Sequence, residues 1–176
     1  MGLTTEALVA RVIALAPTAA AAPAEMVRGQ AVVIVPREQI ATVLPLLRDH
    51  KDLQFTQLMD VSCVDYLGRT PRFEVVYQLL SFPLRQRLRV KVTVPEDDAV
   101  IPSAVPVWKS ANWAEREVYD MFGIRFTGHP DLRRILMYDE FEGHPLRKDY
   151  VLDRRQPLVP ERDPIDRPWF QRVKDA

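Results

Sequence analysis

The chain has 176 residues, of which 47% are hydrophobic and 27% are charged, a composition typical of a soluble globular domain. Lys plus Arg equal Asp plus Glu at 24 each, so no net basic charge is available for a nucleic-acid partner, and we expect none. No apolar run is long enough to cross a bilayer. The single cysteine, Cys63, excludes an internal disulfide and cannot supply the several thiolates of an iron–sulfur cluster.

A short helix is expected over residues 6–15, with Thr4 or Thr5 as its cap. The Ala-rich stretch from Pro17 to Pro23 reads as a loop. Residues 7–24 could instead form a signal peptide, but Glu6 and the lack of a positive leader argue against it. A buried strand over residues 31–35 and a second helix from Pro36 to about His50 follow; the buried face of this helix should hold Ile40, Val43, Leu44 and Leu47.

The next part of the sequence predicts a sheet. A strand region covers residues 55–64 and includes Cys63, which we interpret as a packing residue, with a reactive thiol as the alternative. Two runs of alternating apolar residues, 73–79 and 88–94, are joined by a short Pro-containing loop and predict a hairpin. The charged face of the second run should be solvated or paired with acids of a partner.

A third helix is expected over residues 104–122, with Ser103 as its cap and Gly123 at its C-terminal end. Its charged residues lie beside Trp113, Tyr119 and Phe122, which is unusually aromatic for a solvated surface. The pattern therefore indicates an interface in which Glu115 and Arg116 find partners. Glu115 and Glu117 are two positions apart and do not share a helix face, so they are no acid–base pair.

Regular periodicity fades from Ile124 onward, and after Leu152 the chain is rich in Pro and mixed in charge. Such a tail cannot build its own core; it is either disordered or wraps a partner, with Trp169-Phe170 as an anchor. The residues thus predict an α+β fold, a mixed or antiparallel sheet packed with helices and followed by a long extended C-terminal arm. We divide it into a globular domain, 1–122, and an irregular, partner-binding segment, 123–176.

Two Gly-His-Pro triplets begin at Gly128 and Gly143, and each should form a tight turn followed by paired basic residues. A zinc site using both histidines with Asp131, Asp139 or Glu142 is one hypothesis, but the spacing matches no familiar zinc motif. General acid–base catalysis by His129 or His144 is another. We favour a structural role in holding irregular loops. The chain also lacks a GxGxxG after a strand, a Walker A loop and a CxxC.

Three ordered segments together resemble the C-type subunit of respiratory NADH:quinone oxidoreductase, the complex I 30 kDa subunit family. They run from Trp113 to Ile124, from Gly128 to Leu136 and from Gly143 to Tyr150. The linker from Met137 to Glu142 departs from many members, which have a Trp there. The resemblance implies the family's α+β fold with an extended arm and no catalytic residue. It also implies a set of structural and interface positions: Glu115, Arg116, Glu117, Asp120, Gly128, His129, Arg133, Arg134, Gly143, His144, Arg147, Lys148 and Asp149.

The same resemblance implies a non-catalytic member of the peripheral arm that binds no cofactor or metal itself. FMN and iron–sulfur clusters would sit in partner subunits, with quinone reached only through the complex. Expected partners are the D, B and I type subunits, on the cytoplasmic side of a bacterial inner membrane and peripheral to it. The alternative from the same family is the equivalent subunit of a membrane-bound hydrogenase or a ferredoxin- or F420-dependent complex. A free-standing metal-dependent hydrolase using His129 and His144 is the alternative from another class.

Overall fold

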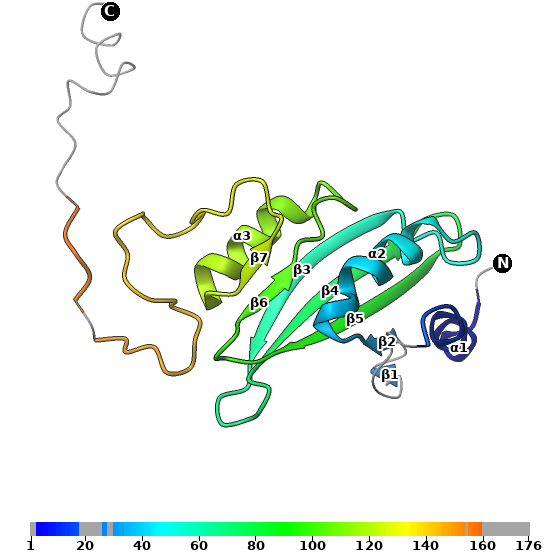
Figure 1. Ribbon diagram of the computed structural model, residues 1–176, viewed down its shortest axis with the longest axis horizontal. Coiled ribbons are helices and arrows are strands. Elements are labelled where there is room, and N and C mark those ends of the chain that lie inside the picture. The colour runs from blue at the N-terminus through cyan, green and yellow to red at the C-terminus, as the bar shows by residue number, and fades with distance from the viewer. Residues whose placement is uncertain (1–2, 18–25, 28–29, 154, 160–176) are drawn as a thin grey trace, which may run out of the picture.

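A computed structural model describes residues 3–17, 26–27, 30–153 and 155–159. Its main sheet has five strands in the order β1-β2-β5-β4-β3, and a second, two-stranded sheet pairs β6 with β7 (Figure 1). The elements are α1 Thr5–Leu15, β1 Met26–Val27, β2 Gln30–Ile34, the 3-10 helix η1 Arg37–Gln39, α2 Ile40–Asp49, β3 Gln57–Asp65, β4 Phe73–Ser81, β5 Gln86–Val94, β6 Val100–Pro102, α3 Ala111–Phe122 and β7 Arg125–Thr127. The architecture confirms the predicted α+β class.

The first two helices form where the sequence predicts them. The Thr4 side chain accepts a hydrogen bond from the Ala7 backbone N–H at 3.3 Å and so caps α1. Helix α2 buries the four apolar side chains expected on one face, Ile40, Val43, Leu44 and Leu47. Most of the predicted loop from Pro17 to Pro23 lies outside the described residues, as does part of the stretch weighed as a signal peptide.

The predicted hairpin is confirmed as β4 and β5, which pair antiparallel from Phe73↔Val94 to Ser81↔Gln86. Alternate residues of both strands join one core cluster with the buried faces of α1, α2 and α3, whereas Val76, between them, does not. The helices therefore cover one face of the sheet. The charged face of β5 was expected to be wet or to meet a partner's acids. This expectation is wrong for Lys91, which pairs with Glu74 of the neighbouring strand at 3.1 Å.

The third helix begins later than expected. Residues 104–110 form turns, and α3 starts at Ala111. Ser103 does not cap it. Its hydroxyl accepts a hydrogen bond from the Val105 N–H at 3.1 Å and donates to a Glu115 carboxylate oxygen at 2.6 Å. The helix end is as predicted, since Gly123 takes a left-handed conformation with φ 78° and its N–H bonds to the Tyr119 carbonyl.

The packed core extends beyond residue 122, because Ile124 and Phe126 are buried and β7 pairs in parallel with β6. Residues 128–153 and 155–159 then run without helix or strand, first beside α3 and then away from the body of the molecule (Figure 1). Trp169-Phe170 lies outside the described residues, and the division at 122/123 stays a prediction. Among the helices in the described ranges, none is long and apolar enough to span a membrane.

Candidate protein-interaction site

The family-signature residues gather on and around α3, which packs against β3. Gly123 ends this helix and allows a close approach, because a Cβ there would lie 2.5 Å from His144 Nε2 and 2.7 Å from Arg147 Nη2. A side chain at this position would push both residues away. The glycine is therefore required by the backbone conformation and by the space.

Glu115 was predicted to meet a partner, but its side chain is completely enclosed (0% exposed). Its two carboxylate oxygens accept hydrogen bonds from the Ser103 hydroxyl and the Ala104 N–H, both at 2.6 Å. Burial raises the pKa of Glu115 to about 7, against the lowering effect of these two bonds. Glu115 thus fastens α3 to the turn after β6, and its partners lie within the chain.

Asp120 is equally enclosed (0% exposed) and accepts a cluster of hydrogen bonds. Its Oδ1 accepts from Arg134 Nη1 at 2.6 Å. Its Oδ2 accepts from three successive backbone N–H groups, those of Ile135, Leu136 and Met137, at 2.8–3.1 Å. Burial alone would raise the pKa of Asp120, but these donors hold it below its usual value. One carboxylate therefore shapes the loop that follows the first Gly-His-Pro turn.

The two Gly-His-Pro turns are attached to opposite ends of α3. His129 Nε2 donates to the Asn112 carbonyl at 3.1 Å, in the first turn of the helix. His144 Nδ1 donates to the Asp120 carbonyl at 2.9 Å, near its last turn. Burial lowers the pKa of His144, with further lowering from nearby arginines, so the ring is neutral near pH 7. Both Gly128 and Gly143 have positive φ, as tight turns require.

The metal-site hypothesis requires these two histidines to converge. They bond instead to carbonyls about two helical turns apart. In the part of the chain that the structure describes, no three His, Cys, Asp or Glu side chains are grouped so as to hold a metal ion.

Cys63 is partly buried against the core, and burial raises the pKa of its thiol to about 12. A protonated thiol agrees with the packing role predicted for it.

Arginines fix the rest of the loop to the helix through carbonyl oxygens. Arg116 donates to the carbonyls of Arg133 and Arg134, at 3.1 and 2.9 Å. Arg134 continues to the carbonyls of Phe141 and Gly143, at 2.9 and 3.1 Å. Arg147 Nε donates to the Phe122 carbonyl at 2.6 Å, and the Arg147 guanidinium group lies over the Phe73 ring. Arg116, Arg134 and Arg147 thus satisfy backbone groups that an irregular segment would otherwise leave unpaired.

Asp149 connects the segment to the sheet through a residue that no sequence motif singles out. Arg72 is 96% enclosed and binds Asp65 at 2.8 Å, Asp149 at 2.6 Å and Glu96 at 2.5 Å. The Lys148 N–H also donates to Asp65, while the Lys148 side chain stays exposed. No local pattern marks Arg72, because its partner Asp149 lies 77 positions away in the sequence.

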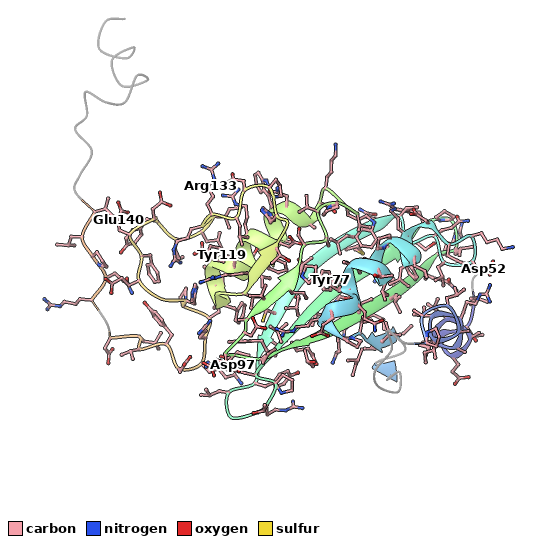
Figure 2. All side chains as sticks on the ribbon, in the orientation of Figure 1. Asp52, Tyr77, Asp97, Tyr119, Arg133 and Glu140 are labelled. Atoms are coloured by element: carbon pink, nitrogen blue, oxygen red, sulfur yellow. The ribbon has the colours of Figure 1, made fainter. Side chains whose placement is uncertain are left out.

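A few signature side chains and their neighbours remain free to meet another protein. Trp113 is 71% exposed, and Glu117, one helical turn later on the same face, is exposed without a bonding partner among the described residues. Figure 2 shows Arg133 and Glu140 on the outer side of the segment, and Arg133 pairs with Asp131 at 2.9 Å. Exposed apolar side chains follow along the arm: Leu136, Tyr138, Leu146, Val151, Leu152, Leu158 and Val159. Such a combination is typical of a protein-binding surface.

Comparison with known proteins identifies relatives of this arrangement. Residues 33–156 match the family described as "Respiratory-chain NADH dehydrogenase, 30 Kd subunit". The C-type subunit of NADH-quinone oxidoreductase from Citrifermentans bemidjiense is 53% identical over 137 residues, which cover 78% of this chain and 81% of that protein. The corresponding protein of Geobacter sulfurreducens is 50% identical over 138 residues, 78% of this chain and 81% of its own length.

Two solved structures share the fold. A trypsin-resistant fragment (1-134) of Nqo5 aligns with a TM-score of 0.61 and 37% identity, covering 74% of this chain and all of that fragment. A chain of the membrane-bound sulfane sulfur reductase, an archaeal respiratory membrane complex, aligns with a TM-score of 0.71 and 26% identity, covering 84% of this chain and 85% of its own. Sequence and structure agree, and the chain belongs to the family of the 30 kDa subunit of respiratory-chain NADH dehydrogenase, as a peripheral-arm subunit of complex I.

Proposed function

We propose that this chain is a non-catalytic, cofactor-free subunit that helps assemble the peripheral arm passing electrons from NADH to quinone. FMN and iron–sulfur clusters are held by its partner subunits, and quinone is reached only through the complex. The observation that carries this proposal is that the enclosed polar side chains of the signature bond to other groups of this chain. Glu115, Asp120 and His144 all form hydrogen bonds within the chain.

Among the described residues, the titratable side chains of the signature do not converge on a shared space for a substrate, which supports a structural role. A catalytic base must reach a substrate proton within hydrogen-bonding distance. Glu115 is completely enclosed, and His144 Nδ1 is held by the Asp120 carbonyl. The hollow beside His144 has a volume of only about 210 Å³ and is lined also by Arg147 and Tyr150. This is small for a ligand pocket.

We infer that its neighbours are the D, B and I type subunits, with the whole assembly on the cytoplasmic face of a bacterial inner membrane. The surface that would meet them combines the exposed face of α3 and the start of the arm. Trp113 supplies the kind of aromatic anchor that dominates binding energy, and Glu117 supplies a charge at its side. This chain reaches the membrane only through those partners.

A sister complex is the second candidate, because the fold is shared with a chain of the archaeal sulfane sulfur reductase at 26% identity. The higher identity to NADH-quinone oxidoreductase subunits, 53% in one case, favours complex I. A hydrogenase or a ferredoxin- or F420-dependent enzyme would use the same surface, since the electron donor binds to other chains.

Purification of the tagged chain from native membranes in mild detergent, with mass spectrometry and an NADH:quinone assay, tests the proposal. We expect flavin- and cluster-bearing subunits to co-purify with activity. Recovery with a hydrogenase-type assembly moves the assignment to the sister complex. Recovery of the chain alone contradicts the proposal and returns attention to a free-standing enzyme, which is then tested by metal analysis of the wild type and of His129→Ala.

A further inference from the structure

A hollow of about 510 Å³ lies at the end of the molecule away from the C-terminal arm (Figure 1). It is bounded by α1, by the connection after α2 and by the turn between β4 and β5. Ala7, Ala10 and Ala14 of α1 line it at the spacing of one helix face, and Leu84 of the turn lies opposite. Because these three side chains are single methyl groups, another backbone can approach α1 closely.

A smaller hollow of about 240 Å³ adjoins the first, since Leu3 lines both. Arg85, Gln86 and Arg87 contribute to its walls. The Gln86 side chain is 94% enclosed, and its Nε2 donates to the Leu3 carbonyl at 2.9 Å. Its Oε1 is buried without a hydrogen-bond partner in the described part of the chain. A buried acceptor left unpaired costs free energy, so the wall of this hollow is not fully satisfied by the described residues.

Positive charge surrounds these hollows. Arg11 and Asp52 pair with each other and cancel (Asp52 is labelled in Figure 2). Lys51, Arg85 and Arg87 line the two hollows, are exposed and form no ion pair within the described ranges. Leu3 and Phe82 add exposed apolar surface beside them. We call the two hollows together the basic groove, lined by Leu3, Ala7, Ala10, Ala14, Lys51, Leu84, Arg85, Gln86 and Arg87.

We propose that the basic groove binds an acidic amphipathic segment of a neighbouring subunit, as a second contact separate from the face of α3 and the arm. This inference rests on the proposed function, because the occupant belongs to the same complex. The apolar side of the partner's segment packs against Ala7, Ala10 and Ala14. The carboxylates of that segment pair with Lys51, Arg85 and Arg87. The groove is concave, which favours an inserted peptide segment over a flat anionic lipid surface.

Zero-length cross-linking of the intact purified complex tests the acidic partner directly. A carbodiimide joins a lysine amine to a carboxylate only where the two already touch. We expect Lys51 to be linked to an Asp or Glu of another subunit, as read by peptide mass spectrometry. Lys51→Arg keeps the charge and should lose the link without loss of assembly. A complex that contains this chain but gives no link from Lys51 to another subunit contradicts the inference.

Accessibility gives an independent readout. Ala14 is exposed, so Ala14→Cys places a reactive thiol in the groove, while the native Cys63, with its thiol pKa raised to about 12, serves as an unreactive internal reference. We expect maleimide labelling of Ala14→Cys to slow by about tenfold or more in the complex relative to the free chain, as for a surface buried in an interface. Equal labelling rates overturn the inference.

Charge reversal distinguishes a failure of the groove proposal from a failure of the proposed function. Lys51→Glu, Arg85→Glu and Arg87→Glu combined should weaken retention of the chain in the complex by about tenfold, more at low salt than at high salt. For net charge, Lys51→Glu alone is compared with Arg69→Glu, a single reversal at an exposed position of the turn between β3 and β4. If the wild type co-purifies with the complex and the triple reversal does so equally well, the groove proposal fails alone. If the wild type itself co-purifies with nothing, the proposed function fails. Binding of the free chain to anionic phosphatidylglycerol vesicles through these residues would replace the protein partner with a lipid surface.

Discussion

The body of the protein and the segment after α3 are held together by different forces. Strands β4 and β5 and helix α2 bury periodic apolar side chains in one core. Each fully buried apolar side chain of this kind stabilises the folded protein by roughly 1.5–3 kcal/mol. Residues 128–150 have few buried apolar side chains and are fixed by charged groups bonded to carbonyls and N–H groups. Asp120, Arg116 and Arg134 carry most of these bonds. The polar motif residues therefore determine the conformation of a loop, whereas the periodic apolar residues determine how the helices pack on the sheet.

The largest effect should come from Asp120→Ala, which removes the acceptor of four donors at once. It leaves Arg134 Nη1 and three partly buried backbone N–H groups without the carboxylate that accepts from them, and we expect a loss of about 3–5 kcal/mol in the free energy of unfolding. Denaturant unfolding of both proteins at pH 7 measures it. Asp139→Ala, at an exposed position of the same segment, should change stability by less than about 0.5 kcal/mol.

The pH dependence of this effect has a definite sign. The pKa of Asp120 is lower in the folded protein than in the unfolded chain. Its stabilisation is therefore present above the unfolded pKa and is lost as the pH falls through the folded one. The cost of Asp120→Ala should shrink in acid. A core truncation such as Leu88→Ala should cost about 2–5 kcal/mol at every pH, which marks the difference between the two regions. Parallel pH dependences would contradict this contrast.

Glu115 should show the opposite pH dependence. Its pKa is raised to about 7 in the folded protein, so folding becomes less favourable as the pH rises from the unfolded value through 7. We expect wild type to lose up to about 3 kcal/mol relative to Glu115→Gln between pH 5 and pH 8. Urea unfolding of both proteins across this range tests it. A constant difference between them would show that the carboxyl is ionised throughout.

Two glycines with similar positive φ, 78° at Gly123 and 80° at Gly128, allow backbone strain to be separated from crowding. Gly128→Ala adds a methyl group with no atom within 4 Å, so it should cost only about 1 kcal/mol for its positive φ. Gly123→Ala has the same strain and also displaces His144 and Arg147. We therefore expect Gly123→Ala to cost at least about 1 kcal/mol more, as measured by thermal unfolding. Equal losses would mean that the segment moves aside freely.

The sequence predicts the body of the fold well and the signature region only in part. Periodic apolar patterns are local, so the α1 cap at Thr4, the face of α2 and the hairpin of β4 and β5 follow from them. The helix start at residue 104 was wrong because Ser103 and Ala104 are bound by the buried Glu115, a contact between distant positions. The enclosure of Glu115 could not be foreseen from a charged pattern.

The signature motif predicts where the candidate site lies, but it does not predict the role of each residue in it. Thirteen residues are predicted from the sequence to be structural or interface positions, and the structure separates them by burial. Asp120 and Glu115 lie inside, whereas Glu117 lies outside with Trp113. Arg72 was missed because no local signal links it to Asp149. The interface role of the exposed positions stays a prediction.

The smallest effect on stability should come from the exposed face of α3. Trp113→Ala and Glu117→Ala remove groups that lack partners within the described chain, so each should change the free energy of unfolding by less than about 0.5 kcal/mol. Their effect should appear in assembly, where truncation of a central aromatic residue costs about 2 kcal/mol or more. Circular dichroism melting of the isolated chain provides the stability measurement.

The structural role of this chain is tested most directly by the double variant Trp113→Ala/Glu117→Ala, expressed in place of the wild-type chain. Assembled complex is quantified by native electrophoresis, and NADH:quinone turnover is normalised to it. We expect assembled complex to fall by about tenfold, with unchanged turnover per complex. Normal complex levels combined with a specific loss of turnover would contradict a structural role and assign chemistry to this chain.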